Sequence, residues 1–225
     1  MGTQRRLSHE ERRESILQAV VPVFARKGFH GATSRELAEA CGISEALLYR
    51  HFRDKPSLYA AIARRHVTDW HLHPGLSRLK ELAPSTGRLV LATQYLFCHF
   101  LAHDRDEVPR LLVQSLLGDG EFARAMMLAL EAEAGALYRE SLDAAARAGD
   151  LLVPVGDLPS GMFLSYLLSL SLRLFALPGR AGSSGAALPH WPDPEAAARF
   201  ALRGLGLRPE ALERDYRPGA WMGLA

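Results

Sequence analysis

Hydrophobic residues recur with the period of an α-helix along most of the chain, and no segment alternates between polar and apolar residues as a strand does. In the first helical segment Ile16, Val20, Val23 and Phe24 form one apolar stripe. Comparable patterns predict further helices over about 86–103, 105–118, 119–148, 158–177 and 194–205. The pattern therefore predicts an all-α protein.

Capping residues mark the ends of the first helices. Ser8 and Glu11 have the spacing of a capping box, and Gly28 is placed to end that helix in the left-handed conformation. A second helix is predicted to begin at Thr33 or Ser34. The first helix is therefore expected to end at Gly28, with a short connection to the second.

A glycine separates the second helix from a third. Gly42 breaks the helical pattern, and Ser44 caps a short helix over Glu45–His51. Asp54 caps a fourth helix, which we expect to end near His73, before a Pro-Gly pair. Two short helices that meet at a glycine are typical of a helix-turn-helix.

The third helix has one apolar and one polar face. Ile43, Leu48 and Phe52 are expected to point to the core. The outer face then carries four small or polar residues: Glu45, Ala46, Tyr49 and Arg50. A helix with such a face can enter a DNA major groove, which is about 12 Å wide.

Charge is unevenly distributed, although the net charge is only +2. Residues 1–65 contain 12 Lys/Arg against 7 Asp/Glu, a balance of +5, and the remainder contains 15 against 18, a balance of −3. This distribution favours contact of the N-terminal part with a polyanion. A chance excess on a solvated surface is the alternative.

Cysteine usage and the N-terminus indicate the compartment. Cys41 and Cys98 each lie inside an apolar helical pattern and predict free or buried thiols in a reducing environment. The N-terminal residues contain no apolar core of a secretory signal. We therefore expect a cytoplasmic protein that needs no cofactor.

The segment 158–177 is nearly uncharged. Its serines and Arg173 argue against a membrane span, because charge at the centre of a spanning helix is costly. Ser165, Ser169, Leu172 and Ala176 share one face on which another helix could approach closely. The segment is interpreted as part of a homodimer interface.

The motif over residues 32–55 resembles the TetR family of bacterial repressors, and the likeness extends over 10–65. The matching positions are Thr33, Leu37-Ala38, Gly42-Ile43-Ser44, Leu48-Tyr49-Arg50-His51-Phe52 and Lys55. The sequence departs from the family's pattern in two places, at the run Glu45-Ala46-Leu47 and at Pro56. The resemblance implies three parts: a helix-turn-helix DNA-binding domain at 1–55, a connecting helix four at 56–75, and a helical ligand-binding and dimerisation domain at 76–225.

The resemblance also implies DNA contacts, position by position. Phosphate contacts are expected from Thr33, Ser34, Tyr49, His51 and Lys55. Base-edge contacts are expected from Arg35, Glu45, Ala46 and Arg50, and Ser44 completes the DNA-binding set. The alternative for Tyr49 and Phe52 is a role as core aromatics.

The C-terminal part contains aromatic, sulfur and polar side chains that suit a small-molecule pocket, and an ordinary core is the alternative. The candidate lining residues are Tyr95, His99, Phe100, Met126, Tyr138, Phe163 and Tyr166. Two helical histidine groups leave a metal site open: His66/Asp69/His73 and His99/His103. Nucleophile-elbow, zinc-protease and phosphate-loop motifs are not found, so an enzyme is not expected.

Together these features predict a ligand-responsive transcriptional regulator. A homodimer would place two recognition helices about 34 Å apart on a palindromic DNA operator. A small-molecule effector would release the homodimer from the operator by shifting helix four. Repression is the usual mode in the family; activation and a non-specific DNA-architectural role are the alternatives.

Overall fold

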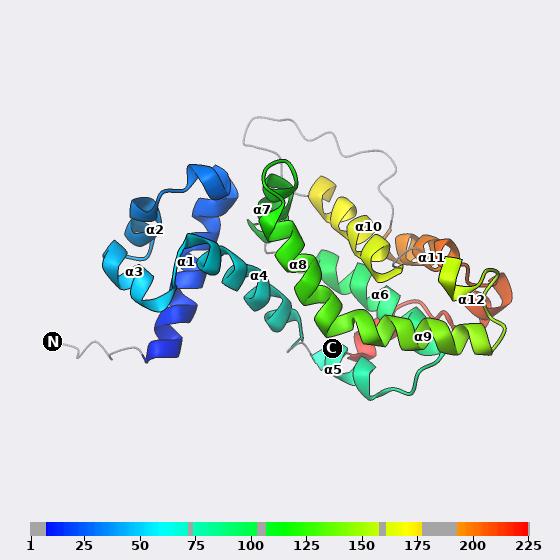
Figure 1. Ribbon diagram of the computed structural model, residues 1–225. Helices are drawn as coiled ribbons and strands as arrows, with labels where there is room; N and C mark the ends of the chain where they lie inside the picture. Colours follow the sequence, from blue (N-terminus) through cyan, green and yellow to red (C-terminus); the bar gives the residue numbers. More distant parts are fainter. Residues whose placement is uncertain (1–7, 72–73, 103–106, 158–160, 177–192, 225) are drawn as a thin grey trace. The chain divides into compact units, whose positions relative to one another are not determined.

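The structure is a computed structural model, which describes residues 8–71, 74–102, 107–157, 161–176 and 193–224. The described residues form helices and connecting turns, with no strand among them, and one isolated antiparallel bridge joins Leu151 to Leu207 (Figure 1). The prediction of an all-α fold is confirmed.

The chain divides into two compact units. The first consists of Met1–Val67 and Arg105–Ala129, and the second of Thr68–Asp104 and Leu130–Ala225. A later segment, 105–129, therefore belongs with the N-terminal helices. Nothing in the helical pattern indicated this grouping, because it depends on contacts between residues far apart in the sequence.

The first unit contains the N-terminal helices and two later ones: α1 (His9–Gly31), α2 (Ser34–Ala40), α3 (Glu45–His51), most of α4 (Lys55–His71), α7 (Glu107–Leu116) and nearly all of α8 (Glu121–Leu130). Helix α7 packs along α1. An aromatic cluster joins α1, α4 and α8, with ring-centroid distances of 4.9 Å from Tyr59 to Phe24, 5.0 Å to Phe29 and 5.2 Å to Phe122. Packing of these large rings therefore holds α1, α4 and α8 together.

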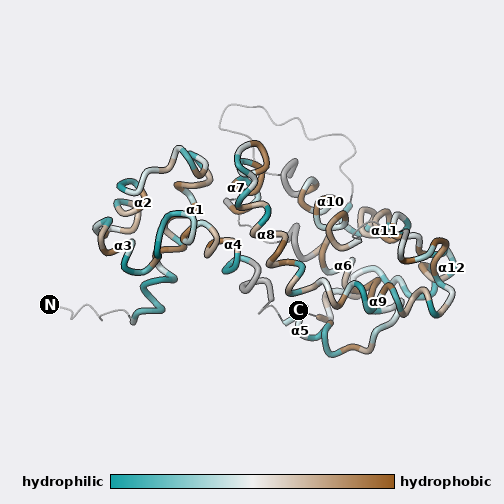
Figure 2. The backbone as a smooth tube through the Cα atoms, viewed as in Figure 1, coloured by the Kyte–Doolittle hydropathy of each residue, from teal (hydrophilic) through white to brown (hydrophobic). Residues whose placement is uncertain are grey.

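The caps predicted for the first unit are present. Ser8 and Glu11 form the reciprocal capping box of α1, whose first turns are hydrophilic (Figure 2). The Asp54 carboxylate accepts from the backbone N–H of Ser57 at 2.7 Å. Gly28 has the expected positive φ of 69° and a ψ of 178°, so the regular helix is interrupted there as predicted. The glycine kinks the backbone, and α1 continues to Gly31.

The second unit is built around α6 (Thr86–Ala102), which packs against α9, α10 and α11. Its other elements are α5 (Pro74–Glu81), a π-helical turn η1 (Glu131–Gly135), α9 (Ala136–Arg147), the 3-10 turn η2 (Val155–Asp157), α10 (Gly161–Ala176), α11 (Pro194–Gly204), α12 (Pro209–Asp215) and the 3-10 turn η3 (Ala220–Leu224). Helices α5 and α12 were not predicted. Each begins with a proline, a residue that is favourable in the first turn.

Helix α10 does not present the predicted stripe to a partner. Ser165, Ser169 and Leu172 are 3%, 0% and 7% exposed in a single chain, so this face is buried inside the unit. The prediction that these residues face another chain is wrong, since the apolar pattern alone does not tell which side of α10 meets α6. Among the described side chains of α10, the exposed apolar ones are instead Phe163 and Leu164, at 37% and 48%. No helix in the described part of the chain is long and apolar enough to span a membrane.

A buried arginine joins α6 to α9. Arg88 is 4% exposed, and its guanidinium donates to the Ser141 hydroxyl at 2.8 Å and to the Glu140 carboxylate at 2.9 Å. It also donates to the carbonyl oxygens of Leu82 and Leu137 at 3.0 and 3.3 Å. A charged group this deeply buried is tolerated only because its N–H groups find acceptors.

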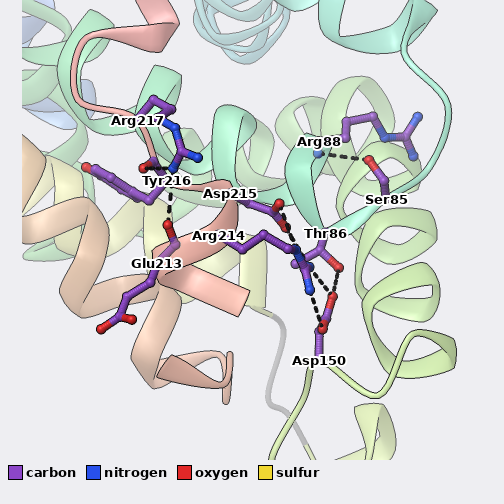
Figure 3. A network of polar contacts seen from close by, with 9 residues as sticks. All are labelled: Ser85, Thr86, Arg88, Asp150, Glu213, Arg214, Asp215, Tyr216 and Arg217. Carbon is purple, nitrogen blue, oxygen red and sulfur yellow. Dashed lines mark hydrogen bonds and ion pairs between the residues drawn. The ribbon is translucent and has the colours of Figure 1, made fainter. Parts of the chain in front are cut away.

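A second polar cluster joins the start of α6, the turn after α9 and α12 (Figure 3). Arg214 donates to both carboxylate oxygens of Asp150, at 3.2 and 2.7 Å, and the Thr86 hydroxyl donates to the same carboxylate at 2.5 Å. The hydrogen bonds from Arg214, followed by that from Thr86, hold the pKa of Asp150 below its usual value. The cluster therefore connects three segments through one ionised carboxylate.

The Asp150 cluster predicts a pH-dependent stability. A carboxyl group whose pKa is lowered by folding stabilises the fold above its unfolded pKa of about 4, and this contribution disappears as the pH falls through the folded pKa. We expect Asp150→Asn to melt below the wild-type protein at neutral pH, and the difference in Tm to narrow steadily toward about pH 3. Thermal melts of both proteins across this pH range measure the difference in Tm. A difference in Tm that does not vary with pH would contradict the assignment.

Candidate DNA-binding surface

Helices α2 and α3 meet at a tight turn. Leu37, Ala38 and Leu48 are at most 2% exposed, and α2 packs against both α1 and α3. Gly42 has φ 63°, a conformation that other residues adopt at a cost. Because the buried side of each short helix is fixed in this way, the opposite side of α3 faces outward.

The predicted DNA-binding residues are mostly accessible. The exposed ones are Thr33, Arg35, Ser44, Glu45, Ala46 and Arg50; the half-buried ones are Ser34, Tyr49 and Lys55; and the buried one is His51. The accessible residues lie on α2, on α3 and at the start of α4. The exposure of Glu45, Ala46 and Arg50 agrees with the outer face expected for α3.

The hydroxyl groups of this surface are held in place by hydrogen bonds. The Ser34 and Tyr49 hydroxyls lie 2.5 Å apart and join the start of α2 to α3. The hydroxyls of Thr33 and Ser44 accept from the backbone N–H groups of their own helices, at 3.3 and 3.2 Å. Each capping hydroxyl still has its own O–H to donate, which is what a phosphate oxygen requires.

Two cations of the surface have partners in the free protein. The Arg35 guanidinium lies 2.8 Å from the Glu39 carboxylate, and both side chains are well exposed, at 81% and 61%. Such an exposed pair is weak, so a base edge can compete for the guanidinium. The Lys55 ammonium lies 4.5 Å from the centroid of the Phe29 ring, and burial lowers its pKa. The ring thus holds the ammonium at the start of α4.

His51 is placed differently from the other predicted contacts. It is 9% exposed, and its ring centroid lies 4.6 Å from that of His9 on α1. Arg13 lies over the Phe52 ring, 4.3 Å from its centroid, and donates to the carbonyl oxygen of His51. The sequence did not indicate His9 or Arg13, because the motif begins after α1 and the packing of α1 on α3 is a tertiary contact.

The predicted ligand-lining residues fall in both units. Tyr95, Tyr138 and Tyr166 are buried in the second unit, and Met126 is buried in the first. Phe163 is 37% exposed. The side chains of His99 and Phe100 lie outside the described residues. The lining of an effector pocket therefore stays a prediction.

Two cavities of the second unit have other linings. One, between α10 and α11, is lined by Leu164, Ser165, Leu168, Phe200, Ala201, Gly204 and Leu205. The other, of about 480 Å³, is lined by Cys98, Asp193, Pro194, Glu195, Pro218, Gly219, Trp221 and Met222. Both cysteines are free.

Most side chains of the two possible metal groups lie outside the described residues, namely those of Asp69, His73, His99 and His103. Among the side chains that are described, no three His, Cys, Asp or Glu residues are arranged to hold a metal ion.

The outward surface of α2 and α3 on an all-helical chain defines a protein with a helix-turn-helix DNA-binding domain. Residues 16–62 match the family model for bacterial regulatory proteins of the tetR family. The match to the tetR family thus covers the segment from α1 to α4 that contains the helix-turn-helix.

Similar proteins are found by sequence and by structure. The chain is 29% identical over 133 residues to the HTH-type transcriptional activator FasR of Mycolicibacterium smegmatis, covering 59% of this chain and 60% of FasR. It is 32% identical over 105 residues to the HTH-type transcriptional repressor AcnR of Corynebacterium diphtheriae, covering 45% of this chain and 50% of AcnR. The matches thus span about half of the length of these relatives.

A solved structure resembles nearly the whole chain. AibR, in complex with isovaleryl coenzyme A and operator DNA, has a TM-score of 0.60 at 20% identity, covering 88% of this chain and 100% of AibR. At this identity the likeness concerns the fold. The helical body behind the DNA-binding domain therefore has the same architecture as in a solved regulator.

Proposed function

We propose that this protein is a ligand-responsive transcriptional regulator that binds a palindromic DNA operator as a homodimer and is released by a small molecule. The observation that carries the proposal is the joined surface of α2 and α3, with the Ser34–Tyr49 hydrogen bond at its centre and a tetR-family match over the same helices. Hydroxyl and ammonium groups at this surface suit phosphates, and the outer face of α3 suits base edges.

Operator binding can be tested on the DNA that flanks the protein's own gene. Gel-shift titrations should show one specific complex whose affinity exceeds that for unrelated duplex DNA by at least about 1,000-fold. A ratio near one would instead favour an architectural DNA-binding role. A reporter gene behind the bound site then separates repression, as named for AcnR, from activation, as named for FasR.

We propose that the second copy packs on the cavity between α10 and α11. Phe200 is 67% exposed beside Leu164, which is 48% exposed, in a groove with mostly apolar lining. Exposed apolar patches of this kind mark interaction sites, and a second copy would bury each Phe200. The exposed side of α10 thus replaces the buried serine stripe as the proposed interface.

Phe200→Asp should dissociate the homodimer. An aromatic anchor at an interface contributes about 2 kcal/mol or more and occurs twice in a twofold dimer, so we expect the dissociation constant to rise at least about 100-fold. Size-exclusion chromatography with light scattering measures the mass. Leu152→Asp, at an equally exposed leucine (58%) outside the groove, is the matched control and should stay dimeric. A Phe200→Asp protein that remains dimeric would place the interface elsewhere.

The proposed effector acts by differential affinity. A small molecule can release DNA only as far as it binds the DNA-free conformation more tightly than the DNA-bound one. AibR was solved with a coenzyme A ester as well as operator DNA, so acyl-coenzyme A compounds are a sensible first set of effectors to screen. The assay is loss of the specific gel-shift complex at a fixed protein concentration.

A further inference from the structure

Two histidines lie together at the start of α1, beside the proposed DNA-binding surface. The His9 and His51 rings are 4.6 Å apart between centroids, with an interplanar angle of 37°. His9 is the first residue of α1 and is exposed, whereas His51 is the last residue of α3. The pair therefore bridges the supporting helix and the recognition helix.

His51 is nine-tenths buried with an unsatisfied ring nitrogen. Its exposed fraction is 9%, and its Nδ1 atom is buried without a hydrogen-bond partner among the described residues. A buried ring nitrogen without a hydrogen-bond partner lowers the stability of the folded protein. A proton on this ring would make both nitrogens donors.

The groups that surround His51 are cationic. Burial, followed by the positive charges of His9 and of Arg50, Arg13 and Arg12, lowers the pKa of His51. Two nearby acids of α1 are engaged elsewhere. Glu11 accepts from the backbone N–H of Ser8, and Glu14 pairs with Arg65. The free protein thus gathers cationic groups around the imidazole pair, an arrangement that an anion would relieve.

We propose that His9 and His51 together form a binding site for a phosphate of the DNA backbone, and that DNA binding takes up a proton there. The inference rests on the proposed DNA-binding function and adds α1 to the contact surface. The proton comes from solvent and is shared by the two imidazoles, and the phosphate balances the charge. His9 is a contact that the helix-turn-helix motif does not include.

The direction of the pH dependence follows from this proton uptake. If the complex binds more protons than the free components, its affinity is highest at low pH and falls as the pH rises through the pKa of the pair in the complex. Each proton taken up changes the affinity by at most about tenfold per pH unit. DNA binding by a surface of arginine, lysine and hydroxyl groups alone has no such slope near neutral pH.

Calorimetric titration of the full chain with duplex DNA tests the site. Titrations at about pH 6.5 in PIPES and in Bis-Tris, buffers of different ionisation enthalpy, report the protons taken up. We expect about 0.3 to 1 proton per subunit for the wild type, and near zero for His9→Gln, whose side chain is exposed so that folding is preserved. His51→Gln should also lose the uptake.

His30→Gln is the matched control. His30 also lies on α1, but it faces Asp119 and is 81% exposed, so its replacement should leave the uptake unchanged. Uptake in His9→Gln equal to that of the wild type, or DNA binding by the wild type without uptake, would overturn this site and leave the proposed function standing. No DNA binding by the wild type at any pH would overturn both.

Discussion

Tyr49→Phe combined with Lys55→Ala should weaken binding to duplex DNA about 100-fold without unfolding the protein. The Tyr49 hydroxyl lies 2.5 Å from that of Ser34, and the Lys55 ammonium lies over the Phe29 ring. Each change removes one expected phosphate contact per subunit, so a dimer loses four. At a net contribution of about 0.7 kcal/mol for each contact, the loss is about 2.8 kcal/mol, which corresponds to about 100-fold in affinity.

The salt dependence separates a lost contact from general damage. A lysine that neutralises one phosphate contributes about 1 to the magnitude of the slope of log affinity against log salt concentration. Because a dimer contains two such lysines, the double variant should have a slope that is smaller in magnitude by about 2. Lys80→Ala is the control, because Lys80 pairs with Glu133 in the second unit. Fluorescence anisotropy at several salt concentrations measures both quantities. An unchanged affinity and slope would remove Tyr49 and Lys55 from the contact set.

Arg88→Leu should destabilise the protein by about 3 kcal/mol. The substitution leaves the Leu82 carbonyl oxygen without its side-chain donor. It also removes one donor each from the Ser141 hydroxyl and the Leu137 carbonyl oxygen, which keep their hydrogen bond to each other. The Glu140 partner is 55% exposed and remains solvated, so most of the cost comes from the uncharged acceptors and from the volume lost. For a chain of this length, 3 kcal/mol corresponds to about 6–12 °C in Tm.

A surface arginine of α9 provides the comparison. Arg139 pairs with Glu131, and these side chains are 64% and 46% exposed. Arg139→Leu should change the free energy of unfolding by less than about 0.5 kcal/mol, because exposed ion pairs are weak. Urea titration of both variants and of the wild type measures the change in the free energy of unfolding. Equal effects would mean that Arg88 does not stabilise the contact between α6 and α9.

The local features of the DNA-binding domain were predictable because they depend on neighbours in the sequence. The capping boxes, the turn at Gly42 and the outward face of α3 follow from residues three or four positions apart. The same reasoning should have found α5 and α12, whose starting prolines are visible in the sequence. The interruption of the first helix at Gly28 was also predictable, whereas the short helical segment that continues to Gly31 was not.

By itself, the sequence determined an all-α chain with a tetR-type helix-turn-helix, and it indicated candidate contact residues, most of which are accessible. The tertiary structure decided which side of α10 is buried, that residues 105–129 pack with the N-terminal helices, and that His9 lies against His51. It also decided that Arg88 is a buried link between helices. Hydrophobic period and capping act within one or two helical turns, whereas each of these contacts joins residues from different helices and depends on how those helices pack.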